Sequence, residues 1–254
     1  LGLLEGRNIG VLDSEFPSDK EASEQGLLAT LDALGYEVTH RHTTATNLGE
    51  AQAQVPVAVS EMQRKNVEVV FLAANFVVVQ SFVNQAASRN FYPQYLASDF
   101  GQIATDKATT GFDAAGFDGA IAFSMLRSHG FKAGLAPNAL ERDCMDRHER
   151  AHGSRFQPDE SQYAITVVQC GLIDTLVRAL DEAGTVLTRE RFTAAQLSFG
   201  AFDIGTLHPL SWGRDKYTGG DYLWAVQWQA GEGCPDDAGD GCWYPIDDVR
   251  PRPV

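Results

Sequence analysis

Two short segments of the sequence carry side chains of the kinds that bind ligands or activate water. Asp99 ends the apolar run 94–99 with a carboxylate, a group that binds an ammonium ion through a charge-assisted hydrogen bond worth about 1.5 to 3 kcal/mol. His148, Glu149 and His152 form an H-E-x-x-H pattern, in which zinc proteases use both histidines as ligands and the glutamate to activate water. The first segment favours a binding protein, and the second favours an enzyme.

The surroundings of the H-E-x-x-H pattern argue against a zinc protease. Residues 142–153 are highly charged, which offers no dry cavity, and Gly153 would end the helix at once. A third ligand is hard to place, because Asp174 and Glu182 lie on or near a helix that reads as packed. The metalloprotease therefore stays a remote alternative, and we predict no enzyme activity, no metal and no cofactor.

The strands and helices predicted around Asp99 make it a candidate for a ligand site. Apolar runs typical of strands at 9–12, 36–40, 67–73 and 94–99 alternate with helical patterns at 18–34, 56–65 and 76–88. We expect the middle helix to start at Pro56, because proline is tolerated in a first helical turn. Strands that alternate with helices predict an α/β fold with parallel strands joined by right-handed crossovers.

Ligands of such sheets bind outside the carboxyl ends of the strands, which here are followed by residues 13–19, 73–76 and 98–100. No glycine-rich loop follows any of these strands, so a nucleotide is disfavoured. The candidate ligand-binding residues are Phe16, Ser18, Asn75, Phe76, Asp99 and Phe100.

Several candidates also have a purely structural interpretation. Asp99 has the alternative role of a cap or turn residue. Ser18, which precedes three charged residues, is a good N-cap for the helix that follows. Asn75 could shape a turn. Phe16 and Phe76 are of a type that more often packs in a core or a lid.

Composition limits the classes of partner. The 254 residues carry a formal net charge of −14, so attraction to nucleic acid or to an anionic membrane is improbable. No run approaches the roughly twenty apolar residues of a membrane span, and we predict no such span.

The pairing of the four cysteines indicates whether the protein lies in an oxidising or a reducing cellular compartment. Cys234 and Cys242 flank a turn-rich loop, and the even count favours a disulfide between them and a second between Cys144 and Cys170. Two disulfides would imply an oxidising, extracytoplasmic location. The alternative is four free thiols in a cytosolic protein.

The order of several segments resembles the periplasmic-binding-protein-like (type I) solute receptors of ABC transporters, in particular the leucine/isoleucine/valine-binding family. The segments that carry this resemblance are 4–12, 31–38, 67–74, 85–99, 163–180, 209–212 and 222–228. The resemblance implies a two-lobed clamp that closes on a small molecule, such as an amino acid or a related organic solute, and delivers it to an ABC permease. A ligand-sensing receptor domain of the same fold is the alternative.

The resemblance also implies a division of the chain. Residues 1–124 match the second, ligand-binding lobe, residues 125–221 match the C-terminal part of the first lobe, and residues 222–254 return to the second lobe with a disulfide-closed tail. The first half-lobe has no counterpart, so we expect an incomplete first lobe and, as a partner, a missing N-terminal portion of the same protein, which could carry a lipid anchor at the periplasmic or cell surface. Independently of the family, the helical patterns between residues 131 and 200 lack a sheet on which to bury an apolar stripe. We therefore expect exposed apolar side chains at Leu172, Ile173, Leu176, Val177 and Leu180.

Family positions can be carried over only to the second lobe. In the family, the loop after the first strand offers a side chain that packs on the ligand, and Ser18 holds that place where an aromatic residue is common. Asn75 and Phe76 match the loop after the third strand. Asp99 matches the acidic residue that takes the ammonium group of an amino-acid ligand.

Overall fold

The computed structural model describes residues 2–158, 160–205, 209–216, 220–231, 234, 239–246 and 252–253. The chain forms two compact units. Unit 1 comprises Leu1–Phe123 with Val226–Trp243, and unit 2 comprises Ser124–Ala225 with Tyr244–Val254.

Unit 1 alternates strands and helices, as the sequence predicts. Its strands are β1 (Ile9–Ser14), β2 (Val38–Thr44), β3 (Val69–Ala73), β4 (Gln94–Ser98) and β5 (Ile121–Ser124). Late in the chain follow β8 (Tyr222–Ala230), which belongs to unit 1 from Val226 onward, and β9 (Gly241–Pro245), which belongs to it as far as Trp243. Its helices are α1 (Pro17–Glu21), η1 (Ala22–Leu28), α2 (Ala29–Ala33), α3 (Leu48–Arg64), α4 (Phe76–Ser88), η2 (Phe100–Gln102), α5 (Asp106–Thr109) and α6 (Ala114–Phe117).

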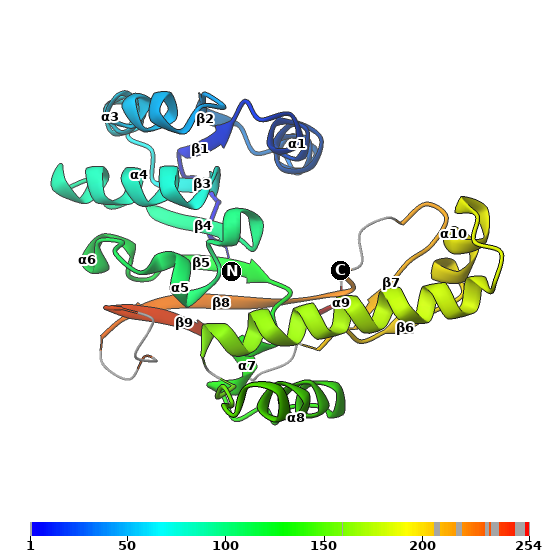
Figure 1. The fold of residues 1–254 in the computed structure, drawn as a ribbon. Coiled ribbons are helices and arrows are strands. Elements are labelled where there is room, and N and C mark those ends of the chain that lie inside the picture. Colours follow the sequence, from blue (N-terminus) through cyan, green and yellow to red (C-terminus); the bar gives the residue numbers. More distant parts are fainter. Residues whose placement is uncertain are drawn as a thin grey trace. The chain divides into compact units, whose positions relative to one another are not determined.

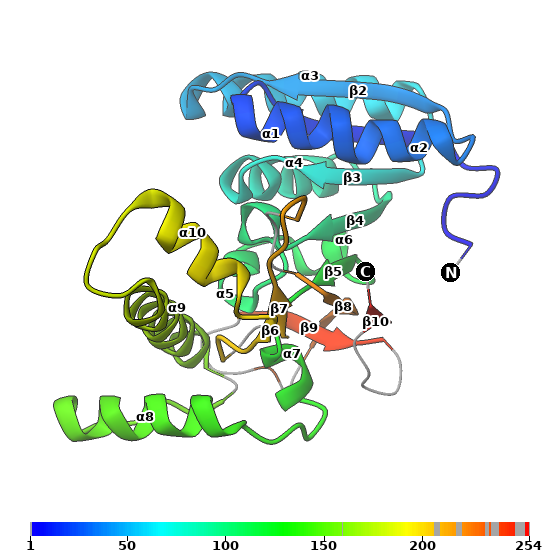
Figure 2. The same ribbon diagram turned by 90° about the vertical axis from the view of Figure 1, so that its right-hand side faces the viewer.

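The sheet of unit 1 has the order β2-β1-β3-β4-β5-β8, and β9 also pairs with β8. The pairs from β2 through β5 are parallel. The α1–η1–α2 helix covers one face of the sheet, and α3 and α4 cover the other (Figures 1 and 2). The strand order reverses direction between β1 and β3, and open α/β sheets bind ligands at such a switch point, outside the carboxyl ends of the strands.

Coverage on both faces explains the composition of the strands and helices. All six residues of β1 are buried, as expected for a central strand of a parallel sheet. Helix α4 has the bounds that its pattern predicts and buries Val79, Phe82, Val83 and Ala86. These side chains recur at the spacing of one helical face, so α4 lies with that face against the sheet.

The predicted start of α3 at Pro56 is wrong. The helix begins at Leu48, the Asn47 side chain caps it by accepting from the N–H groups of Gly49 and Glu50, and Pro56 lies inside it. Proline removes one backbone hydrogen bond from the helix. The apolar stripe that α3 buries, Ala51, Val55, Ala58, Val59 and Met62, supplies the stabilisation that outweighs this loss.

Aromatic side chains fix the late strands to unit 1. The Phe117 ring lies 5.5 Å from that of Trp228 on β8 and 5.7 Å from that of Trp243 on β9, between ring centroids. Trp228 Nε1–H donates to Thr109 Oγ1 at 3.1 Å, and Trp243 Nε1–H donates to the carbonyl of Ile103 at 3.1 Å. Both indoles are therefore buried with their polar atom satisfied, the condition under which a tryptophan stabilises a core.

Unit 2 is mainly helical. Its helices are α7 (Ser128–Phe131), α8 (Ala139–His152), α9 (Ser161–Ala183) and α10 (Arg189–Leu197), and its short strands are β6 (Ala201–Phe202), β7 (Leu210–Ser211) and β10 (Arg252–Pro253), the last pairing with the start of β8. Helix α9 packs against both α8 and α10 (Figure 2). A capping box of Asn138 and Glu141 starts α8. Gly153 ends the helix, as the sequence predicts, and has the left-handed conformation.

Both cysteine pairs form disulfides. Cys144 on α8 is bonded to Cys170 on α9, with Cα atoms 6.0 Å apart, and Cys234 is bonded to Cys242, with Cα atoms 5.7 Å apart. The first bond joins the two long helices of unit 2. The second closes the loop that leads into β9.

Helix α9 qualifies the expectation that no segment resembles a membrane span. Residues Gln162–Ala183 have the length and the apolar composition to cross a membrane, and only 22% of that window is buried. The same helix has specific contacts within unit 2, including the disulfide and an ion pair between Asp174 and Arg147 with an N–O distance of 2.8 Å. We therefore treat α9 as a packed helix with one uncovered face.

Candidate functional site

The carboxyl ends of β1, β3 and β4 meet at one edge of the unit 1 sheet. Asp13 near the end of β1 is in register with Ala73 at the end of β3. The loop after β4 lies directly on the loop after β3, since a Cβ atom on Gly101 would be 2.7 Å from the carbonyl oxygen of Ala74 and 3.4 Å from the nitrogen of Phe76. Gly101 also has a positive φ of 63°, so this close approach requires glycine.

Three of the predicted site residues lie in these touching loops. Asn75 is the N-cap of α4, and its side chain accepts from the N–H of Val77 at 2.9 Å. Phe76 is the first residue of α4 and is half-buried, and Asp99 is half-buried between β4 and η2. The Asp99 carbonyl accepts from the N–H of Gln102 at 2.9 Å. Asn75 and the Asp99 backbone therefore have the structural roles that were the alternative interpretation, and whether their side chains also bind a ligand stays a prediction.

The loop after β1 differs from its predicted form. Ser18 is not the N-cap of the first helix, because Phe16 occupies the cap position and Pro17 begins the helix. The fixed φ of proline suits that first helical position. The Ser18 hydroxyl donates to Asp19 Oδ1 at 3.0 Å. Phe16 is 53% exposed, which leaves its ring out of the core. Phe100 begins η2, and its side chain lies outside what the structure describes.

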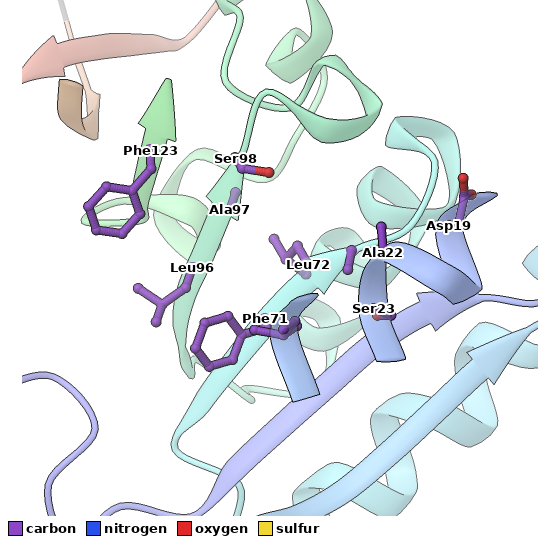
Figure 3. A pocket seen from close by; sticks show the side chains of 11 residues that line it. Asp19, Ala22, Ser23, Phe71, Leu72, Leu96, Ala97, Ser98 and Phe123 are labelled. Atoms are coloured by element: carbon purple, nitrogen blue, oxygen red, sulfur yellow. The ribbon is translucent and has the colours of Figure 1, made fainter. Parts of the chain in front are cut away.

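An open cavity of about 350 Å³ lies on the face of the sheet beside the α1–η1 helix (Figure 3). Phe71, Leu96 and Phe123 form its floor from three adjacent strands. Residues of α1 and η1 form its wall, among them Asp19, Ser23 and Leu27, and Ser98 lines it at the end of β4. The cavity is therefore mostly apolar, with a carboxylate and two hydroxyl groups among its lining side chains.

The wall of this cavity contains an irregular helix with an unsatisfied hydroxyl. Residues Ala22–Leu28 form a π-helical stretch between two α-helical ones, a feature that often occurs at functional sites. Within it, Ser23 is 2% exposed, and its Oγ has no hydrogen-bond partner among the residues that the structure describes. A buried hydroxyl of this kind costs free energy unless it is satisfied.

A buried ion pair holds the end of β1. Asp13 is fully buried, and its Oδ2 lies 2.8 Å from Arg41 on β2. Arg41 also approaches Glu24 of η1 at 3.4 Å, so one guanidinium links two strands and the helix that walls the cavity. Asp13 Oδ1 has no partner within the described part of the chain. Sequence reasoning placed Asp13 in a loop and missed this role, although an acid directly after an apolar run is the signal that could have found it.

Two histidines lie on β2, the strand that carries Arg41. Burial lowers the pKa of His42, and the nearby Asp13 carboxylate opposes that shift. Burial, followed by the charge of Lys65, lowers the pKa of His40. The Nε2 atoms of both rings are buried without a hydrogen-bond partner among the described residues. The folded state therefore favours the neutral form of both rings.

The H-E-x-x-H segment does not form a metal centre. His148 and His152 lie on α8 with ring centroids 4.7 Å apart, but His148 Nδ1 is 3.0 Å from the carbonyl oxygen of Ser154, and Glu149 pairs with Arg155 at 3.3 Å. No group of three or more His, Cys, Asp or Glu side chains within the described ranges could hold a metal ion. The zinc-protease alternative thus receives no support.

Comparison with known proteins identifies the fold. The chain matches no protein-family model and none of the curated proteins. Among solved structures it is similar to a substrate-binding periplasmic protein from Ralstonia solanacearum, with 20% identity, 94% of this chain and 62% of that chain covered, and a TM-score of 0.66. It is also similar to a leucine-, isoleucine-, valine-, threonine- and alanine-binding protein from Brucella ovis, with 14% identity, 97% and 58% covered, and a TM-score of 0.66.

A third similar structure is a branched chain amino acid ABC transporter protein from Thermus thermophilus with bound valine, with 12% identity, 97% of this chain and 60% of that chain covered, and a TM-score of 0.67. At these identities the likeness establishes the fold, which is the type I periplasmic-binding-protein fold expected from the sequence. The chain spans 58% to 62% of the length of these three structures.

We predict that Arg41→Met lowers the free energy of unfolding by about 3 kcal/mol, because it leaves the buried Asp13 carboxylate without its cation. Urea unfolding monitored by circular dichroism measures the change. Arg7→Met, at an exposed arginine, is the matched control and should have little effect. The double variant Asp13→Asn/Arg41→Met should be more stable than Arg41→Met alone. Equal stability of Arg41→Met and Arg7→Met would contradict the role of the ion pair.

We predict that His42 makes the free energy of unfolding depend on pH. Because the pKa of His42 in the folded state lies below its ordinary value of 6.5, the unfolded state binds more protons at low pH, and stability should fall as the pH drops below about 6.5. Urea midpoints at pH 8 and pH 5.5 should therefore differ more in the unmodified protein than in His42→Leu. His152→Leu, at an exposed histidine, should keep the full dependence. The same decline in all three proteins would show that His42 does not cause it.

Proposed function

We propose that this chain is the major part of an extracytoplasmic solute-binding protein that captures a small amine-bearing molecule and delivers it to an ABC permease. The observation that carries this proposal is the convergence of the loops after β3 and β4 at the carboxyl edge of the unit 1 sheet, with the half-buried Asp99 in one of them. The edge lies at the switch point of the strand order, where open α/β sheets bind ligands.

The cavity beside this edge supports a small organic solute. Its volume of about 350 Å³ is within the range of sites for small molecules. The apolar floor of Phe71, Leu96 and Phe123 suits an aliphatic or aromatic body. Ser98 lines the cavity at the end of β4, and Asp99, the next residue in the chain, follows it without being a lining residue itself. An amino acid with an apolar side chain combines these two features, and the bound valine of one similar structure supports that class.

The disulfides support the proposed compartment. Disulfides persist in oxidising environments such as the periplasm and the cell surface, and all four cysteines are bonded. The net charge of −14 fits a protein whose ligand and partner are neither nucleic acid nor anionic lipid. Delivery to a permease rests on the fold shared with ABC transporter binding proteins.

The proposal predicts that Asp99→Asn weakens binding of an amine-bearing solute about 10- to 150-fold, because a neutral amide replaces the carboxylate that receives the ammonium group. The natural full-length protein is first screened by thermal shift against the L-amino acids, since a ligand of the folded state raises the melting temperature. Isothermal titration calorimetry then measures the affinity of the best ligand and of its analogue without the amine.

Asp32→Asn, at an exposed aspartate of α2, is the matched control and should bind as the unmodified protein does. The analogue without the amine should bind weakly to both the unmodified protein and Asp99→Asn, with little difference between them. Equal amino-acid affinity of Asp99→Asn and Asp32→Asn would return Asp99 to the role of a turn residue. Absence of any stabilising solute in the screen would contradict an amino-acid ligand altogether.

A further inference from the structure

The two histidines of the H-E-x-x-H segment form a close pair at the end of α8. His148 and His152 are four residues apart, so their side chains are neighbours on consecutive turns of the helix. Their ring centroids are 4.7 Å apart. His148 is half-buried, and His152, the last residue of the helix, is exposed. An ion from solvent can therefore reach the pair.

The His148 ring is held in one orientation. Its Nδ1 lies 3.0 Å from the carbonyl oxygen of Ser154, and because a carbonyl only accepts, Nδ1 carries the proton and Nε2 keeps its lone pair. The Phe156 ring packs against His148 with centroids 4.9 Å apart. Metal-bound histidines commonly donate their second ring N–H to a backbone carbonyl in this way, which fixes both the tautomer and the direction of the ring.

The separation of the two rings fits two ligands of one metal ion. A metal–imidazole bond is about 2.0 Å long, so each ring centroid lies about 3.2 Å from the ion. Two rings at adjacent, perpendicular positions of that ion then have centroids about 4.5 Å apart, close to the 4.7 Å of His148 and His152. The rings of His40 and His42 are 6.4 Å apart and have buried Nε2 atoms, so they do not offer a comparable pair.

The charges at this end of α8 favour a cation. The last turn of a helix carries the negative end of the helix dipole, and His152 lies in that turn. The guanidinium of Arg155, in the segment after the helix, is paired with Asp146 at 2.6 Å and with Glu149 at 3.3 Å. Two carboxylates therefore offset the positive charge of this arginine.

A chelate of two imidazoles is a different kind of site from a zinc centre. Structural zinc sites use four protein ligands and catalytic ones use three, and the described ranges contain no group of three or more suitable side chains. Copper(II) accepts imidazole and water as ligands in a tetragonal geometry, and it binds a given set of nitrogen ligands more tightly than Ni²⁺ or Zn²⁺ does. Two adjacent imidazoles at an exposed position thus favour copper(II).

We propose that His148 and His152 form a chelate site for copper(II) on the surface of unit 2. The ion is bound by Nε2 of His148 and by a ring nitrogen of His152, and water molecules take its remaining positions. The sequence predicted no metal here, because it offered neither a third ligand nor a dry cavity, and a two-imidazole chelate needs neither. The site lies apart from Asp99 in the chain and does not depend on the identity of the solute.

A variant that keeps the histidine count tests the chelate directly. Arg150→His/His152→Arg exchanges two exposed side chains, preserves the net charge, and leaves histidines two residues apart, which do not face each other on a helix. Isothermal titration of the untagged natural full-length protein with copper(II), in the presence of glycine as a weak competitor, measures the affinity. We expect the affinity to fall at least about tenfold in this variant, because the second imidazole no longer binds the same ion.

Two further measurements identify the ligands and the metal. Electron paramagnetic resonance of the bound copper(II) should show coupling to two imidazole nitrogens in the unmodified protein and to at most one in His152→Gln. Copper(II) should raise the melting temperature of the unmodified protein more than that of the exchange variant, because only the folded helix holds the two rings together. Zinc should bind the unmodified protein more weakly than copper(II) does.

Three results would overturn the proposal. The first is equal copper(II) affinity of the unmodified protein and the exchange variant, which would place the bound ion elsewhere. The second is a copper(II) spectrum that does not change in His152→Gln, and the third is tighter binding of zinc than of copper(II). Solute binding in Asp99→Asn is measured separately, so failure of the copper site and failure of the proposed function are distinguishable.

Discussion

The structure depends on one constraint: an α-helix or a parallel strand with an apolar side must cover that side with another layer. In unit 1 the constraint is met on both faces of the central strands, where α3 and α4 bury their stripes and β1 is buried along its whole length. Burial of the apolar side of α3 outweighs the presence of Pro56 inside this helix, although a proline in a helix interior costs about 3 kcal/mol. In unit 2 the same constraint is met on two sides of α9 and left open on the third.

The candidate site follows from how the sheet of unit 1 is built. Its strand order places the ends of β1, β3 and β4 side by side, and close approach of the loops at Gly101 leaves Asn75 and Asp99 in neighbouring loops. Burial of Asp13 at this edge requires a cation, and Arg41 supplies it while reaching the helix that walls the cavity. The Asp13–Arg41 pair thus fixes the end of β1, while the part of the cavity over β3, β4 and β5 is mostly apolar, with the Ser98 hydroxyl at the end of β4.

Sequence patterns predicted those parts of this arrangement that depend on local periodicity. Helix α4, the strand that ends before Asp99 and the left-handed Gly153 cap of α8 have the predicted positions. The exposure of Leu172, Ile173, Leu176, Val177 and Leu180 on α9 was also predicted, because helical patterns in a region without strands have no sheet on which to bury an apolar side.

The errors arose where tertiary packing or a neighbouring residue overrides a local preference. Pro56 has the sequence pattern of a helix start, but α3 extends on both sides of it because its buried apolar residues stabilise the longer helix. Pro17 takes the first position of α1, so Phe16 and not Ser18 is the N-cap. The Asp13–Arg41 pair and the unsatisfied Ser23 hydroxyl depend on strand register and on a π-helical stretch. Neither leaves a periodic signal in the sequence. The cavity is likewise formed by residues from five separate elements.

Hydrogen–deuterium exchange of the natural full-length protein, with and without the solute that stabilises it most, tests the central claim most directly, namely that a solute binds at the carboxyl edge of the unit 1 sheet. The account predicts slower exchange on binding in the loops after β1, β3 and β4, within residues 15–19, 74–77 and 99–103, and little change in the middle of α3. Slower exchange confined to other segments, with these three loops unchanged, would contradict it.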